Sequence, residues 1–125
     1  MPLGPGLHGS AKLIVADDDT ALAMRSGDVP VLATPRVIAL CEEAAVAAIV
    51  EHVPTGQTTV GMRVQVDHLA PTSVGTQVAA EATLEKVEGR RLTFTVTVSD
   101  PCGLVAAGKV TRVVVETERF LDKAR

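Results

Sequence analysis

Apolar residues dominate the stretch from Thr34 to Val50 and leave no broad polar face when that stretch is drawn as a helix. Such a run predicts a helix that is buried on all sides rather than one that lies on the surface. Its first residue, Thr34, is expected to cap the amino end with its hydroxyl, and Pro35 suits the first helical position. Because Pro54 cannot continue a helix, the helix is expected to end near His52 or Val53.

Most of the chain after this helix alternates between apolar and polar residues with a period of two, which is typical of strands that bury one face. Strands are expected at residues 58–69, 76–87, 91–99 and 104–116, joined by short turns. Before the helix, a short strand is expected at 12–16, and residues 20–24 are expected to resume it. This order predicts an α+β fold, in which a curved antiparallel sheet wraps around one long central helix.

The chain has 125 residues, enough for one domain with a hydrophobic core, so a single domain over residues 1–125 is expected. The Gly- and Pro-rich residues 1–10 are predicted to lie loosely on its surface as a flexible segment. We interpret the acidic run Asp17–Asp19 as a solvated turn, because the spaced ligands and glycine of a calcium loop are missing. No cluster has metal-ligand spacing, so no metal site is expected.

Charge and composition narrow the classes of function. The net charge of −3 argues against nucleic-acid binding, which needs a concentrated basic face. No apolar run reaches membrane-spanning length and no signal peptide is evident, so the protein is expected in the cytoplasm and away from membranes. Cys41 and Cys102 are expected to be free thiols in that reducing compartment.

Two adjacent carboxylates, Glu42 and Glu43, interrupt the apolar run of the helix. Neighbouring residues lie about 100° apart around a helix axis, so the two carboxylates face different surroundings. Glu42 shares its face with Ile38 and other apolar residues, whereas Glu43 has Arg36 two turns back. Glu42 is therefore the one expected to be buried, either as a structural carboxylate with a satisfied partner or as an active-site group.

A histidine and an arginine stand at apolar positions of the predicted strands. Even-numbered residues of the strand at 58–69 form its apolar face, and His68 ends that face as either a satisfied core residue or a functional one. Arg112 shares a face with Val110 and Val114, so it needs a partner, for which Glu42 and a ligand phosphate are both suitable.

The last strand also carries a prediction about assembly. Residues 110–115 are apolar on both faces, and no second long helix is expected to cover the outer one. Self-association is therefore predicted to cover it.

Four segments taken together, in order, resemble the hotdog-fold thioesterases of the fluoroacetyl-CoA thioesterase type. These segments are residues 31–34, 41–44, 60–68 and 87–92, and the resemblance extends over about residues 12 to 120. It implies a hotdog fold and a homodimer whose two sheets join edge to edge. It also implies hydrolysis of acyl-CoA thioesters in clefts at the dimer interface. By position, Thr34, Glu42 and His68 match the family's catalytic trio, and Arg112 matches an arginine of a relative.

One departure from the family pattern concerns the acyl group. The fluoroacetyl-specific enzyme has aromatic side chains in the loop before the threonine, whereas residues 25–32 of this chain include none. The resemblance therefore implies a thioesterase that acts on a different small or medium acyl group.

The residues themselves suggest the same chemistry. Glu42 is expected to act as a general base on water, or as a nucleophile that forms a mixed anhydride, with His68 shuttling the proton. Thr34 is expected to position water or substrate, although a plain capping role is the alternative. A backbone N–H near Gly61 is a candidate oxyanion donor, and Arg112 a candidate substrate-binding residue. Since CoA is part of the substrate, no separate cofactor is expected.

Other basic residues are candidate partners of the CoA phosphates, but most surface arginines and lysines are merely solvated, so none of them is assigned to the phosphates. They are Arg63, Arg90, Arg91, Lys109 and Arg119. Two alternatives to a thioesterase also remain. A non-catalytic acyl-thioester binding protein would have no reason to bury a carboxylate beside a histidine. A hotdog hydratase or dehydratase usually has a histidine motif on the central helix, and this helix has no histidine before His52.

Overall fold

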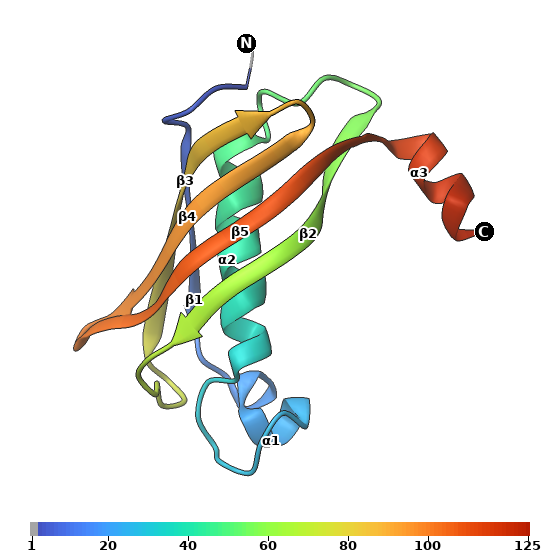
Figure 1. Ribbon diagram of the computed structural model, residues 1–125. Coiled ribbons are helices and arrows are strands. Elements are labelled where there is room, and N and C mark those ends of the chain that lie inside the picture. The colour runs from blue at the N-terminus through green and yellow to red at the C-terminus, as the bar shows by residue number, and fades with distance from the viewer. Residues whose placement is uncertain (1–2) are drawn as a thin grey trace.

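A computed structural model of the chain describes residues 3–125, and Figure 1 shows its elements along the chain. They are β1 (His8–Ile14), η1 (Asp17–Asp19), α1 (Ala21–Met24), α2 (Thr34–Ile49), β2 (Gln57–His68), β3 (Gln77–Glu88), β4 (Arg91–Asp100), β5 (Gly103–Glu116) and α3 (Thr117–Ala124).

The five strands form one antiparallel sheet in the order β1-β3-β4-β5-β2. This sheet is curved, and α2 lies along its hollow side (Figure 1). The two hairpin turns stand where the sequence predicts them: Gly89 has a φ of +63°, and Asp100 Oδ1 accepts hydrogen bonds from the N–H groups of Cys102 and Gly103. The predicted α+β hotdog architecture is therefore confirmed.

The core lies between α2 and the middle of the sheet. Alternation in β3 and β4 translates directly into burial, because every second side chain of both strands faces the helix. Phe94 is the largest fully buried side chain, and the remaining core residues are almost all aliphatic. Cys41 lies in this core, whereas Cys102 is exposed in a turn, and both are free thiols.

Three predictions about the amino-terminal part are wrong. Strand β1 begins at His8, not at residue 12, so residues 8–10 are part of the sheet rather than a loose segment. It begins early because Gly9 packs directly on the backbone of α2 at Ala44 and Ala48, where a Cβ would collide. Residues 20–24 do not resume the strand, since Thr20 caps the short helix α1 by accepting a hydrogen bond from the N–H of Ala23.

The pattern of β2 is also different from the prediction. Gly61 pairs with Arg112, but Arg63 pairs with Thr111, so Met62 is an extra residue in a β-bulge. A bulge reverses the phase of the side chains on its two sides. As a result Gly61 lies on the inward face together with Arg112, whereas even-numbered residues face inward only after the bulge.

Helix α2 is shorter and less buried than predicted. It ends at Ile49 with Val50 as its C-cap, a few residues before the expected end. One face packs into the core, but the opposite face is open, with Val46 39% and Val50 63% exposed. The prediction of burial on all sides is therefore wrong for a single chain.

The last element is a short helix rich in charged residues. Helix α3 continues from β5 and projects away from the sheet on the side of β2 (Figure 1). None of its residues is buried, although Phe120 and Leu121 are apolar. Across residues 3–125, no helix has the length and apolar character needed to cross a membrane.

Candidate active site

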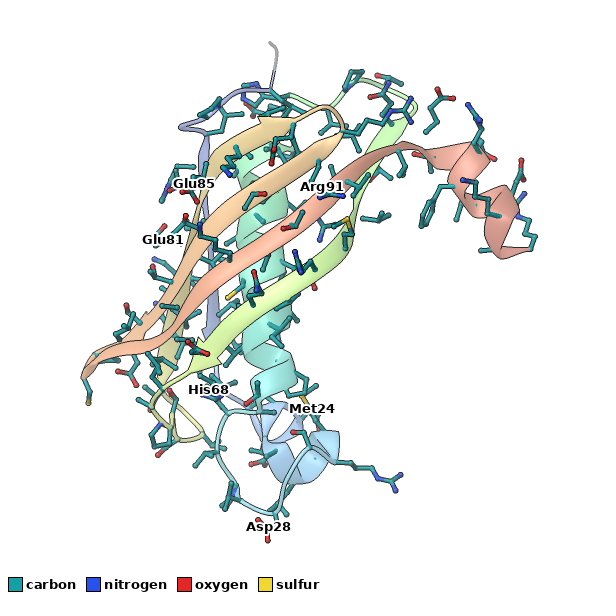
Figure 2. The ribbon with its side chains drawn as sticks, in the orientation of Figure 1. Met24, Asp28, His68, Glu81, Glu85 and Arg91 are labelled. Atoms are coloured by element: carbon teal, nitrogen blue, oxygen red, sulfur yellow. The ribbon has the colours of Figure 1, made fainter. Side chains whose placement is uncertain are left out.

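Thr34 and His68 meet where the start of α2 lies against the end of β2. Thr34 Oγ1 and His68 Nδ1 share a hydrogen bond of 2.8 Å. Figure 2 shows His68 at the end of β2, beside the first turn of α2. The predicted capping role of Thr34 is wrong: Ala33 is the N-cap, and Thr34 is already helical. Its hydroxyl therefore forms a hydrogen bond with the imidazole of His68 and not with the helix backbone.

A cavity of about 340 Å³ opens beside this pair. Apart from Thr34 and His68, most of its lining is aliphatic or backbone, from the loop before α2 and the loop after β2 (Ala21, Val29, Val31, Leu32, Leu69, Ala70 and Pro71 among others). His68 Nε2 is buried and has no hydrogen-bond partner in the described part of the chain. A buried imidazole nitrogen with no partner is costly, so its presence beside a cavity is typical of a site that a ligand completes.

Glu42 projects from the open face of α2 and forms an ion pair with Arg112. Arg112 Nη1 donates to Glu42 Oε2 at 2.8 Å, and only 8% of Arg112 is exposed. Thr59 accepts two further hydrogen bonds from this guanidinium, one from Nε to its hydroxyl at 3.0 Å and one from Nη2 to its carbonyl at 2.9 Å. Of the two partners expected for Arg112, the structure provides Glu42 within the chain.

Gly61 makes this arrangement possible. A Cβ at Gly61 would collide with Glu42 Oε2 and approach Arg112 Nη1. The bulge at Met62 turns Gly61 inward at this point, so a residue without a side chain faces the carboxylate. The structure therefore brings both predicted substrate-binding residues, Gly61 and Arg112, to the carboxylate of Glu42.

Glu43 is more exposed than Glu42, as the helical spacing predicts, but Glu42 is only partly buried in a single chain, with 31% of its side chain exposed. Glu43 Oε2 lies 3.1 Å from Arg36 Nη1, and Arg36 Nε also lies 3.2 Å from Asp19 Oδ1. Glu43 is thus a partner in a surface ion pair, and the acidic run belongs in part to the same network. Through Arg36, these ion pairs connect η1 to the first turns of α2.

The predicted trio does not come together in one chain. Glu42 is eight residues beyond Thr34, which is about 12 Å along a helix axis, and no hydrogen bond joins it to Thr34 or His68 within residues 3–125. The structure instead contains two pairs, Thr34–His68 and Glu42–Arg112. Sequence reasoning missed Thr59, because only the reversed phase before the bulge turns it toward Arg112.

Cys41, next to Glu42 along the helix, has no chemical role in this arrangement. Burial raises the pKa of its thiol from 9.0 to about 11, and the nearby charge of Glu42 adds to the shift. A thiol with so high a pKa is protonated at neutral pH and is a poor nucleophile.

Comparisons with known proteins agree with this fold. The chain resembles solved thioesterases of the hotdog type, including a thioesterase superfamily member from Thermus thermophilus. That match has a TM-score of 0.91 at 26% identity, and covers 99% of this chain and 92% of the other. The fold is therefore that of a hotdog-fold thioester hydrolase.

The family can be stated more closely. The model of the fluoroacetyl-CoA-specific thioesterase family matches residues 15–118. A fluoroacetyl-CoA thioesterase from Streptantibioticus cattleyicolor is 35% identical over 95 residues, which are 76% of this chain and 68% of that protein. A solved fluoroacetyl-CoA thioesterase superposes with a TM-score of 0.94 at 27% identity, covering 100% of this chain and 97% of that one. This chain belongs to that family, as its motifs predict.

Proposed function

We propose that this protein hydrolyses a small or medium acyl-CoA to the free acid and CoA. The observation that carries the proposal is the Thr34–His68 hydrogen bond at a mainly aliphatic cavity, in a chain that belongs to a thioesterase family. Water adds to the thioester carbonyl, the C–S bond breaks, and the proton released from water ends on the CoA sulfur. This reaction consumes only water and the thioester, so the proposal includes no separate cofactor.

Each member of the predicted trio has a role in this reaction. Glu42 activates water as a general base, or attacks the carbonyl itself and forms a mixed anhydride that water then opens. His68 carries the proton to the leaving sulfur, and Thr34 orients the imidazole through its hydrogen bond. Arg112 holds one carboxylate oxygen of Glu42, and a backbone N–H near Gly61 stabilises the developing oxyanion.

These roles require that Glu42 act with the Thr34–His68 pair of a second copy of the chain. Strand β2 is an edge strand, so one side of its backbone is free to pair. Met62 and Val64 are exposed on it, and Val46 and Val50 are exposed on the neighbouring face of α2. Antiparallel pairing of two β2 strands about a twofold axis would cover these residues and turn the end of one β2 toward the middle of the other.

Such a homodimer brings together Glu42 and His68, which lie apart within one chain. Gly61, next to Glu42, lies near the middle of β2, and His68 lies at its end. A twofold axis between these two positions brings the partner's His68 to Glu42. The active sites would then lie at the dimer interface, each with Glu42 from one protomer and the Thr34–His68 pair from the other.

The lining of the cavity beside Thr34 and His68 bears on which acyl group the protein accepts. No aromatic side chain lines it, and the loop before α2 contributes Val29, Val31 and Leu32. A flexible aliphatic lining of this kind suits a short or medium aliphatic chain better than a single fluoroacetyl group. We place the reaction in the cytoplasm, where the free thiols of Cys41 and Cys102 would remain reduced.

The test is thiol release from a panel of acyl-CoA thioesters, with the wild type beside Glu42→Gln. We expect turnover of a small or medium acyl-CoA and a loss of at least about 10²-fold in kcat in the variant. Near-normal turnover in a folded Glu42→Gln protein would contradict the assignment of Glu42. Saturable binding without thiol release would favour a binding protein, and a change in enoyl absorbance would favour a hydratase.

Mixed dimers test the shared active site. Protomers with Glu42→Gln and with His68→Gln are co-expressed under two affinity tags, and dimers that carry both tags are isolated. If the site is shared, one of the two sites in each mixed dimer has both native groups, and about half of the wild-type activity returns. Activity no higher than that of the two variant homodimers would rule the shared site out.

A further inference from the structure

Three basic side chains gather around one small cleft, far from His68 of the same chain. Arg90, from the β3–β4 turn, lines the cleft together with Arg119 and Lys123 of α3. Arg119 and Lys123 are four residues apart and so lie on the same side of the helix. None of the three forms an ion pair in the described part of the chain, although Glu116 also lines the cleft. In a protein with a net charge of −3, such a cluster favours an anionic ligand.

A larger cavity adjoins this cleft. Its volume is about 330 Å³, and it shares Arg90, Val115 and Glu116 with the cleft. His52 lines it as well, and His52 Nδ1 is buried with no hydrogen-bond partner among residues 3–125. Cations beside a cavity with an unsatisfied buried nitrogen suit a ligand that carries both an anionic group and a group able to form a hydrogen bond with the imidazole.

The distance between the cleft and Glu42 fits the length of an acyl-CoA molecule. Arg112, which holds Glu42, is five residues before the first residue of α3, a distance of about 17 Å along a strand. An extended pantetheine arm spans a distance of this order. The cleft is much farther from His68 of its own chain, because Glu116 pairs with Gln57 at the opposite end of β2, about 37 Å from His68.

We propose that the cleft of Arg90, Arg119 and Lys123 binds the nucleotide phosphates of acyl-CoA for the active site that contains Glu42 of the same protomer. The adjoining cavity then receives the adenosine, and the arm lies along the open face of α2 toward Glu42. The proposal rests on the proposed acyl-CoA hydrolysis.

The first experiment compares two substrates with the same acyl group, acyl-CoA and the acyl-pantetheine thioester, which lacks the phosphates. In the triple variant Arg90→Gln, Arg119→Gln, Lys123→Gln, we expect KM for acyl-CoA to rise at least about 10-fold with kcat nearly unchanged. The kinetics with acyl-pantetheine should not change. The control is Lys12→Gln, an exposed cation on β1 at the other edge of the sheet, which should leave both substrates unaffected.

An unchanged KM for acyl-CoA in the triple variant would overturn the proposal while the hydrolase function stands. Equal losses with both substrates would overturn it too, since they would indicate a structural effect. If the wild type releases thiol from no substrate, calorimetry with free CoA separates the two ideas. Weaker binding of CoA by the triple variant than by the wild type would support the cleft, and equal binding or no binding would refute it.

Mixed dimers test which protomer the cleft serves. The triple variant paired with His68→Gln has one site with native Glu42, native cleft and the partner's native His68, so turnover with a low KM should return. The triple variant paired with Glu42→Gln has no such site, and its KM should remain high. The opposite pattern would assign the cleft to the protomer that supplies His68.

Discussion

Strands β4 and β2 have similar sequence patterns and different structures. Both alternate between apolar and polar residues, yet every inward position of β4 is buried, whereas no residue of β2 is. Strand β4 lies between β3 and β5 and faces the centre of α2, while β2 is an edge strand with a bulge. Alternation of apolar and polar residues therefore predicts burial only for a strand that is paired with another strand on each side. The irregular strand carries the candidate site residues Gly61 and His68, together with Thr59, which holds Arg112.

The largest effect on stability is expected for β4, the regular strand. Phe94 on β4 is fully buried, and Phe94→Ala should lower the free energy of unfolding by about 3–5 kcal/mol through lost burial and the cavity left behind. The matched control is Phe120→Ala on α3, where the ring is 41% exposed and a loss below about 1 kcal/mol is expected. Urea denaturation of both variants measures the difference. Similar losses would mean that α3 belongs to the cooperative core.

The irregular strand should respond in activity rather than in stability. In Gly61→Ala, the added methyl group collides with Glu42 Oε2 and displaces the carboxylate from Arg112. We expect kcat to fall by about 10²-fold, in line with the loss of a general base, while the unfolding midpoint changes little. Gly4→Ala is the control, because a Cβ there meets nothing within 4 Å. Full activity in Gly61→Ala would show that Glu42 does not need this position.

The smallest effect concerns the core side of α2 and depends on pH. Because the pKa of Cys41 is about 11 in the folded protein and 9.0 without burial, the folded state keeps its proton between these two values while the unfolded state loses it. The stability that this proton contributes is complete below pH 9 and is lost as the pH rises toward 11. Between pH 8 and 10, the wild type should lose about 1 kcal/mol more than Cys41→Ala.

Urea titrations of both proteins at the two pH values give this difference directly. Equal losses would mean that the thiol ionises as easily in the folded protein as in the unfolded chain. The same protonation predicts that thiol reagents at pH 8 modify Cys102 and leave Cys41 intact, since Cys102 is exposed.

Local patterns were sufficient to predict the sheet, the central helix and the hairpin turns. They singled out Glu42 and His68 as polar residues at apolar positions, while the resemblance to the family added Thr34, and the catalytic roles of the three stay predictions. Local patterns missed the bulge in β2, because even-numbered apolar residues continue across it, although a glycine inside a strand pattern, here Gly61, is a signal for a bulge. They also failed at Thr34, where a good capping residue forms a hydrogen bond with a histidine 34 positions away. The separation of Glu42 from His68 depends on how the helix crosses the sheet, which no local pattern contains.

The start of α2 offers a way to engineer this protein. Its N-cap, Ala33, has no side chain that can accept a hydrogen bond, and the next hydroxyl, on Thr34, is bound to His68. Serine, aspartate or asparagine at an N-cap typically adds about 1 kcal/mol over alanine. Because Ala33 is buried, the hydroxyl of Ala33→Ser would leave water, and the first-turn N–H groups of α2 would have to serve as its partners. Ala33→Ser would therefore add to thermal stability only through this capping hydrogen bond, and it would replace no group of the candidate site.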